Sequence, residues 1–587
     1  MTRRASLSYR SSLMRSLSVC AALATLSTMV GCMSLITLPG LPGRSKPEEK
    51  KTLKELADDD TPDLISKFTH PFGLDYVKVE ALSMVTGLSG TGEDPPPTPQ
   101  RAAMMAEMNR MRVENPEKVL ASPDTALVLI RGMLRPGIQE GDRFDVEVRV
   151  PSKSETTSLR GGWLLSARLT ELAVLGGQIR QGHVLGVAEG AILVDPSANE
   201  EDGTYATRGR ILGGGVAAKS RPMGLVIDDR YKSVHLAAQI GKSVNDRFYM
   251  RIDGHKRGVA NAKNDELIEI AVHPRYKDNV GRYMRVLQSL AVIETGREQQ
   301  ERVELLREQI ANPLTAASAA LQLEAIGDDQ AKEILLQAIL SSDTEVRFYA
   351  AESLAYLDET AAVEVLAQVA RDEPAFRVNA MAALSAMDDL AAFDALHGLL
   401  SVDSAETRYG AFRSLWAMNP HDPLVAGENM NGNFTLHQLN VEGPPMIHVT
   451  NSHRPEIVLF GKQPSLKLPL LVDAGTGVLI NGMQGQELVV SRFRTGSEAD
   501  RRVIQPEVDE LIRAIVELGG NYPDVVQALQ EANKQGALKS RMRVDALPQS
   551  GRKYSRPEDV KEGETQEEES TFDLATPLPD LFGRKSR

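Results

Sequence analysis

The sequence predicts an α+β (mixed α/β) body into which an all-α stack of repeated helix pairs is inserted. Short runs of alternating apolar residues, typical of half-buried strands, occupy residues 68–297 and return over 434–546. Between them, residues 300–425 are rich in Ala and Leu and repeat with a regular period. A chain of 587 residues is too long to form a single small hydrophobic core. Its contents of 42% hydrophobic and 25% charged residues are typical of globular proteins.

Residues 1–32 predict an export signal. The first 16 residues carry four arginines and no acid, and an apolar stretch over 17–30 is too short to cross a bilayer. The stretch ends at Met29-Val-Gly-Cys32, which resembles a bacterial lipoprotein box in which Cys32 carries the lipid. The alternative is a plain signal peptide cleaved nearby. Both take the mature chain out of the cytoplasm, and lipidation of Cys32 would add an outer-membrane anchor.

Residues 33–67 mix proline, lysine and aspartate with little apolar periodicity, so we expect a disordered tether. The body follows, with strands predicted at 144–150 and 190–194 from alternation of apolar side chains. Helices are predicted at 99–109 and at 235–248, where apolar residues recur four apart.

The helical region repeats three apolar columns in one register. The small residues Ala319, Ala350, Ala380 and Ala411 recur 31, 30 and 31 residues apart, and larger apolar residues follow each at offsets of four and seven. These offsets place the three columns on one helix face, which must be buried against a neighbouring unit. The block resembles short HEAT repeats, and the resemblance implies an interaction module.

Arginines recur in the same repeats. Arg347, Arg377 and Arg408 precede the alanine column by three residues. We consider two interpretations: an ion pair, either solvated or within a repeat, and a ridge that binds a protein partner.

After the repeats, strands are predicted at 434–437, 446–449, 456–460, 477–480 and 487–490. A helix pair is predicted at 506–518 and 523–535, separated by a Gly-Gly stop. The tail, 547–587, is acidic and poor in apolar residues, so we expect it to be disordered.

Several segments occur in an order that resembles the bacterial flagellar P-ring protein family. They include Gly87-Leu-Ser-Gly-Thr-Gly-Glu-Asp94, Gly141-Asp-Arg-Phe-Asp-Val-Glu-Val148 and Ser158-Leu-Arg-Gly-Gly-Trp-Leu-Leu165. Residues 208–215, 231–248, 447–452 and 506–538 extend the resemblance. It covers a P-ring-like N-terminal part, 68–297, and a P-ring-like C-terminal part, 434–546.

The resemblance implies a structural subunit of a periplasmic ring around the flagellar rod, working by packing rather than catalysis. Its implied partners are other copies of the chain and the rod and L-ring proteins, with an extra protein partner conceivable on the repeats. Positions expected to serve turn geometry, packing or subunit contact are Gly87, Gly90, Gly92, Asp94, Leu159, Arg160, Gly161 and Gly162.

Other chemistries find little support in the sequence. The formal charge of −13 disfavours nucleic-acid binding, and two cysteines near the N-terminus leave none in the body for zinc or catalysis. Gly213–Ser220 resembles a phosphate-binding loop but has Ala218 where the second glycine belongs. We therefore expect no enzyme, no metal and no cofactor, and contact with a membrane only through Cys32. The rival hypothesis is an envelope-tethered binding lipoprotein of the same fold, whose repeats hold a partner outside any flagellum.

Overall fold

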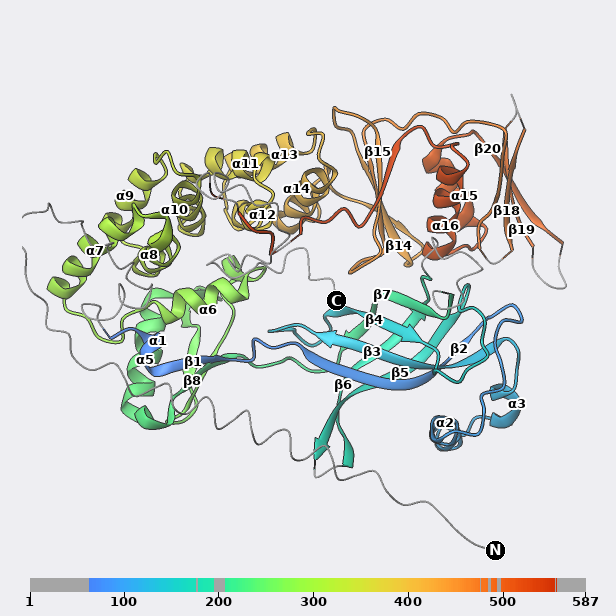
Figure 1. The fold of residues 1–587 in the computed structure, drawn as a ribbon, viewed down its shortest axis with the longest axis horizontal. Coiled ribbons are helices and arrows are strands. Elements are labelled where there is room, and N and C mark those ends of the chain that lie inside the picture. Colours follow the sequence, from blue (N-terminus) through green and yellow to red (C-terminus); the bar gives the residue numbers. More distant parts are fainter. Residues whose placement is uncertain are drawn as a thin grey trace, which may run out of the picture. The chain divides into compact units, whose positions relative to one another are not determined.

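The computed structural model describes residues 63–175, 178–194, 206–475, 477–483, 487–493, 498–549, 551–554 and 556, with the side chains of 172–181 left aside (Figure 1). These residues all fall within one compact unit of the chain. The predicted signal at 1–32, Cys32, most of the tether and most of the acidic tail lie outside the described residues.

A closed six-stranded barrel forms the first large element. Its strand order is β2-β3-β4-β7-β6-β5. The bounds are β2 (Val77–Thr86), β3 (Thr125–Leu134), β4 (Arg143–Arg149), β5 (Trp163–Leu175), β6 (Gln178–Ala191) and β7 (Arg208–Ala217). The alternation that predicts β4 turns Phe144, Val146 and Val148 into the core. Two short helices, α2 (Pro99–Arg110) and α3 (Pro116–Leu120), bury methionines and Leu120 against the outer face of β2 and β3.

The strand predicted at 190–194 ends three residues earlier than expected. β6 stops at Ala191, and Leu193 makes only an isolated bridge to Arg210. Leu193 leaves the barrel because its side chain joins the core of the C-terminal part of the chain.

A small sheet accompanies the barrel. It has the order β1-β8-β12-β11 and sits with a separate hairpin of β9 and β10. The bounds are β1 (Thr69–Phe72), β8 (Gly224–Ile227), β9 (Tyr249–Ile252), β10 (His255–Gly258), β11 (Ala260–Ala262) and β12 (Leu267–Ile270). Helix α5 (Val234–Arg247) confirms the helix predicted at 235–248, and α1 (Ile65–Phe68) and α6 (Val280–Gln288) complete the group. Ile65 is fully buried, so order begins a few residues earlier than the sequence suggests.

Eight consecutive helices form the repeat block, drawn in green to yellow in Figure 1. They are α7 (Gly296–Ile310), α8 (Pro313–Ile326), α9 (Asp329–Ala338), α10 (Thr344–Tyr356), α11 (Ala362–Asp372), α12 (Arg377–Ser385), α13 (Leu390–Leu399) and α14 (Ala405–Met418). The predicted alanine column falls on α8, α10, α12 and α14, one residue per helix, and each of its members is fully buried. The repeat register is confirmed, and the small side chains lie where helices pack closely.

The C-terminal part combines two sheets with two helices. One sheet has the order β13-β14-β16-β15-β21 and the other β17-β18-β19-β20. The bounds are β13 (Glu428–Met430), β14 (Phe434–Leu439), β15 (Met446–Val449), β16 (Glu456–Phe460), β17 (Leu470–Asp473), β18 (Val478–Gly482), β19 (Leu488–Arg492), β20 (Asp500–Ile504), α15 (Val508–Glu517), α16 (Tyr522–Lys534) and β21 (Arg541–Val544). Both sheets and both helices contribute to one core.

The repeat block does not form a separate domain with its own hydrophobic core. A single apolar cluster runs from Ile227 and Tyr283 through the repeats to Val458 and Phe460 of β16. The repeats are therefore packed against the small sheet at one end and against the C-terminal part at the other.

Candidate functional site

The two motif turns of the barrel lie against each other. Thr91 Oγ1 donates a hydrogen bond to the Ser158 carbonyl at 2.8 Å, and the Thr157 amide donates to the Thr91 carbonyl at 3.0 Å. Leu88 and Leu159 are buried beneath these bonds. The segments 87–94 and 158–165 thus form one paired feature, although 67 residues separate Thr91 from Ser158.

At several of these positions there is no room for a side chain larger than that of glycine. A Cβ on Gly92 would lie 2.0 Å from the Thr125 carbonyl oxygen, and one on Gly162 would lie 2.4 Å from Val85 Cγ1. Gly87, Gly90 and Gly161 adopt positive φ values that disfavour other residues.

Two charged positions of the same motifs make contacts outside them. Asp94 pairs with Arg101 of α2. Arg160 lies near Asp473 of β17: burial raises the pKa of Asp473, and the Arg160 charge partly offsets that rise. The first turn therefore contacts the covering helix, and the charge of the second acts on a carboxyl of the C-terminal part.

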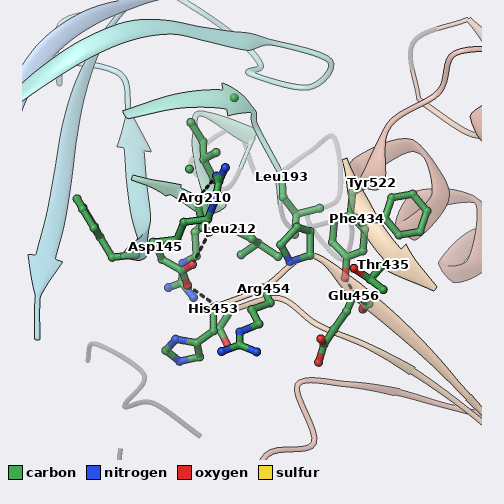
Figure 2. Close-up of a pocket in the computed structure, with 18 of the residues that line it drawn as sticks. Asp145, Leu193, Arg210, Leu212, Phe434, Thr435, His453, Arg454, Glu456 and Tyr522 are labelled. Carbon is green, nitrogen blue, oxygen red and sulfur yellow. Dashed lines mark hydrogen bonds between the residues drawn. The ribbon is translucent and has the colours of Figure 1, made fainter. Parts of the chain in front are cut away.

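A carboxylate joins the barrel to the C-terminal part of the chain. Asp145 Oδ1 accepts from the Gly213 amide at 2.9 Å, and its Oδ2 accepts from the His453 amide at 2.6 Å (Figure 2). Arg210 Nη1 donates to the Asn451 carbonyl at 3.2 Å. Three segments of the sequence resemblance, 141–148, 208–215 and 447–452, thus converge on one place.

A cleft of about 1440 Å³ opens beside this contact. Figure 2 shows Leu193 and Leu212 reaching from the barrel side toward Phe434 and Tyr522, and all four belong to the C-terminal core. The cleft is also lined by Trp416 of α14, so the barrel, the repeats and the C-terminal part all contribute to its wall.

Two arginines of this cleft share one aromatic ring. The guanidinium carbons of Arg413 and Arg454 each lie 4.3 Å from the centroid of the Trp416 ring. The Arg454 side chain opens into the cleft, yet the surrounding protein and the Arg413 charge lower its pKa to about 10. Stacking on an aromatic face stabilises such a poorly solvated guanidinium.

A buried acid holds α14 of the repeats to the C-terminal sheet. Tyr409 donates to Glu456 Oε1 at 2.5 Å and Arg413 Nη1 to Oε2 at 3.3 Å. Burial alone would raise the pKa of Glu456, but Arg413, His437 and the Tyr409 hydroxyl together lower it. His448 stacks on Tyr409 with ring centroids 3.7 Å apart, and burial lowers the pKa of His448 to about 3.

A second buried acid network holds the other end of the repeats. Arg282 of α6 donates to Glu324 Oε2 at 2.5 Å, and its Nη1 lies 2.7 Å from Glu352 Oε2. Tyr276 donates to Glu324 Oε1 at 2.7 Å, and the Arg282 guanidinium carbon lies 4.9 Å from the Tyr356 ring centroid. All three charged side chains are at most 1% exposed, so they are paired with each other rather than with water.

The repeat arginines make local contacts. Arg347 donates to the carbonyls of Ser341 and Ser342, Arg377 to those of Ala370 and Arg371, and Arg408 to those of Leu400 and Pro444. Most of these carbonyls lie at or just beyond the end of the preceding helix, where they lack helical partners. Arg377 also forms an ion pair with Glu406 of α14, its Nη1 lying 3.2 Å from Oε2, and Arg377 and Arg408 are buried.

The sequence assigns no role to Asp145 or Glu456, although both lie in predicted strands, and it gives no role to Arg282, Glu324 or Glu352. Glu324 does leave a signal, since it is the one acid in the Ala- and Leu-rich helix α8. Glu352 is less distinctive, because α10 also contains Glu345. In the described part of the chain, no three His, Cys, Asp or Glu side chains are grouped so as to hold a metal ion. The helices described there are also too short or too polar to cross a membrane.

Comparison with known proteins identifies two parts of the chain. Residues 71–305 match the family model described as flagellar P-ring protein, and residues 302–385 match the model described as HEAT repeats. The flagellar P-ring protein of Thermotoga maritima is 24% identical over 221 residues, which are 36% of this chain and 61% of that protein. That of Pseudoalteromonas atlantica is 30% identical over 176 residues, 28% of this chain and 45% of the relative. The similarity thus spans less than two thirds of these relatives, and the chain combines a segment similar to flagellar P-ring proteins with HEAT repeats.

Proposed function

We propose that this chain is a structural subunit of the flagellar basal body that assembles with copies of itself into the periplasmic P ring around the rod. The match of residues 71–305 to flagellar P-ring proteins is the observation that carries the proposal. In that assembly the chain works by packing rather than by catalysis, with the rod and L-ring proteins as neighbours. Export through residues 1–32 and lipidation of Cys32 are part of the proposal.

The C-terminal part, 434–546, lies outside the matched residues, and we propose that it is the second half of the same P-ring-like body. Its support is the contact at Asp145, which joins residues of the matched barrel to His453. The repeats then act as a brace between the two halves, because both of their ends carry a buried acid network.

A closed ring needs two different faces that complement each other. The barrel offers one candidate face on β5, where Trp163 and Leu165 are each 42% exposed within the motif segment 158–165. Exposed large apolar side chains on a motif segment are typical of an interface. We assign this face of β5 to subunit contact.

The test replaces Trp163 and Leu165 with serine and isolates basal bodies from cells that carry the epitope-tagged chain. We expect the variant to be lost from basal bodies and motility to fall, while the purified chain melts normally. The control is Leu340→Ser, which alters an apolar side chain that is 82% exposed on the repeats. If the unaltered tagged chain is absent from basal bodies, the proposed function is wrong. If the unaltered chain and the β5 variant are both retained, the assigned face is wrong.

One observation favours the rival function of an envelope-tethered binding lipoprotein. The repeats carry an acidic and aromatic surface that accepts an extended peptide segment, described next. A tagged chain that is absent from basal bodies but enriches one envelope protein through this surface would support that rival.

A further inference from the structure

The chain does not leave the fold where the predicted tail begins. After β21, the Ala546 amide donates to His448 Nε2 at 3.0 Å, and Leu547 and Tyr554 pack against the core of the repeats. Among the described residues beyond 546, Arg552 and Arg556 also contact the repeats.

Three residues of the repeats form what we call the ladder: Glu345, Phe376 and Glu406. They lie at the starts of α10, α12 and α14, 31 and 30 residues apart, and so occupy nearly the same position in three successive repeats. The ladder presents an acid, an aromatic ring and an acid in turn.

Three residues after β21, which we call the clasp, contact the ladder one by one. Arg552 donates from Nη1 and Nη2 to the two carboxylate oxygens of Glu406 at 2.9 and 2.7 Å. The ring of Tyr554 lies 4.8 Å from that of Phe376, and Arg556 Nε donates to Glu345 Oε2 at 2.5 Å.

The spacing of the clasp matches an extended strand. Arg552, Tyr554 and Arg556 are two residues apart, so in an extended chain their side chains point to one side, and Lys553 between the first two is exposed. The bidentate pairing of Arg552 requires a planar guanidinium, which lysine cannot supply. The ladder thus selects for arginine and an aromatic residue at fixed intervals.

The contacts are suited to exchange. The side chains of Arg552 and Glu406 are 30% and 26% exposed, and Arg556 is 27% exposed against a Glu345 side chain that is 9% exposed. Phe376 is fully buried with the clasp in place. The arginine side of each ion pair reaches water, so both pairs weaken as salt rises.

We propose that the ladder is a docking site for an extended peptide with the pattern Arg-x-Tyr-x-Arg. The clasp occupies it within the chain, and a partner protein carrying a segment of the same chemistry binds by displacing the clasp. This proposal concerns the repeats and stands apart from assembly of the ring.

The first experiment opens the site in the full chain with Arg552→Ala, Tyr554→Ala and Arg556→Ala together. The probe is a labelled peptide of residues 549–558, titrated by fluorescence anisotropy. A tethered segment competes at an effective concentration of about millimolar. We therefore expect the opened chain to bind the peptide at least tenfold more tightly than the unaltered chain, with affinity falling as salt rises.

Matched variants identify the site. Adding Glu345→Gln and Glu406→Gln to the opened chain should weaken peptide binding at least tenfold, while a peptide with Lys553→Ala should bind as before. Circular dichroism melting checks that each variant is folded. Equal binding by opened and unaltered chains, or binding that survives loss of both ladder acids, would overturn the proposal.

A second measurement leaves the clasp intact. Trypsin should cut after Arg552 and Lys553 faster when the clasp is released, so Glu345→Gln with Glu406→Gln should speed cleavage there severalfold. Cleavage at an unchanged rate would also refute the proposed exchange.

Discussion

Replacing Arg282 with methionine should destabilise the chain strongly. Methionine keeps most of the side-chain length but leaves Glu324 and Glu352 without their cation, and both carboxylates are fully buried. Breaking a buried ion pair by removing one partner costs about 3–5 kcal/mol. For domains of 150–250 residues, 1 kcal/mol shifts Tm by about 2–4 °C, so we expect a loss of roughly 6–20 °C in a thermal melt.

The stability loss of the Arg282→Met variant should also change with pH in a defined direction. Burial and the charge of Glu324 already raise the pKa of Glu352, and loss of Arg282 raises it further. A carboxyl whose pKa is higher in the folded than in the unfolded chain binds more protons when folded, so its folded state gains stability as pH falls. The deficit of the Arg282→Met variant should therefore be smaller at pH 5 than at pH 8.

Two matched variants separate this explanation from general damage. Arg297→Met removes an arginine that is 88% exposed and paired with Glu301, and its Tm should stay within about 2 °C of the unaltered chain. Adding Glu324→Gln and Glu352→Gln to Arg282→Met should recover much of the loss, because no buried charge remains. A small loss in the single variant, or no recovery in the triple variant, would refute the role assigned to the network.

Two further predictions concern packing and pH. Gly162→Ala places a Cβ 2.4 Å from Val85 Cγ1 and should cost about 1–3 kcal/mol in urea unfolding, whereas Gly296→Ala, with nothing within 4 Å, should be neutral or stabilising; equal effects would refute the steric argument. Burial lowers the pKa of His448 in the folded chain to about 3. The free energy by which neutral His448 stabilises the folded chain is therefore fully present above the unfolded pKa near 6.5, and it is lost as pH falls from there toward 3. Unfolding free energies at pH 7, 6 and 5 should fall less steeply for His448→Gln, and parallel slopes would contradict this.

Local pattern was enough to predict the repeats and most of the strands. The alanine column fixes the register of α8, α10, α12 and α14 because a 3.6-residue period and a 30-residue period agree along the chain. Alternation likewise predicts β4 and β14, and short apolar runs predict β15 and β16, in which every residue is buried.

Closure of the barrel could not be predicted in the same way. Alternation says which face of a strand is buried but not which strand is its neighbour, and closure here depends on β2 pairing with both β3 and β5. The partners of buried charges cannot be predicted from the sequence either, because Arg282 comes within reach of Glu324 and Glu352 only when the helices pack together.

Contacts at both ends of the repeat block explain how it can separate the N-terminal and C-terminal parts in sequence and still hold a fixed orientation relative to each of them. At each end a buried carboxylate is met by an arginine and by a tyrosine hydroxyl: Glu324 by Arg282 and Tyr276, and Glu456 by Arg413 and Tyr409. Such contacts are directional, so they fix the orientation of a helix more strictly than apolar packing alone.

The clasp adds a third attachment that differs in kind. It arises from the C-terminal part, beyond β21, and crosses α14, α12 and α10 through partly exposed ion pairs. Because the two buried networks already hold the repeats at both ends, release of the clasp would uncover the ladder without loosening the brace. The same helices can therefore support the body through the faces that pack in the core and bind a peptide at their first residues, which the clasp covers.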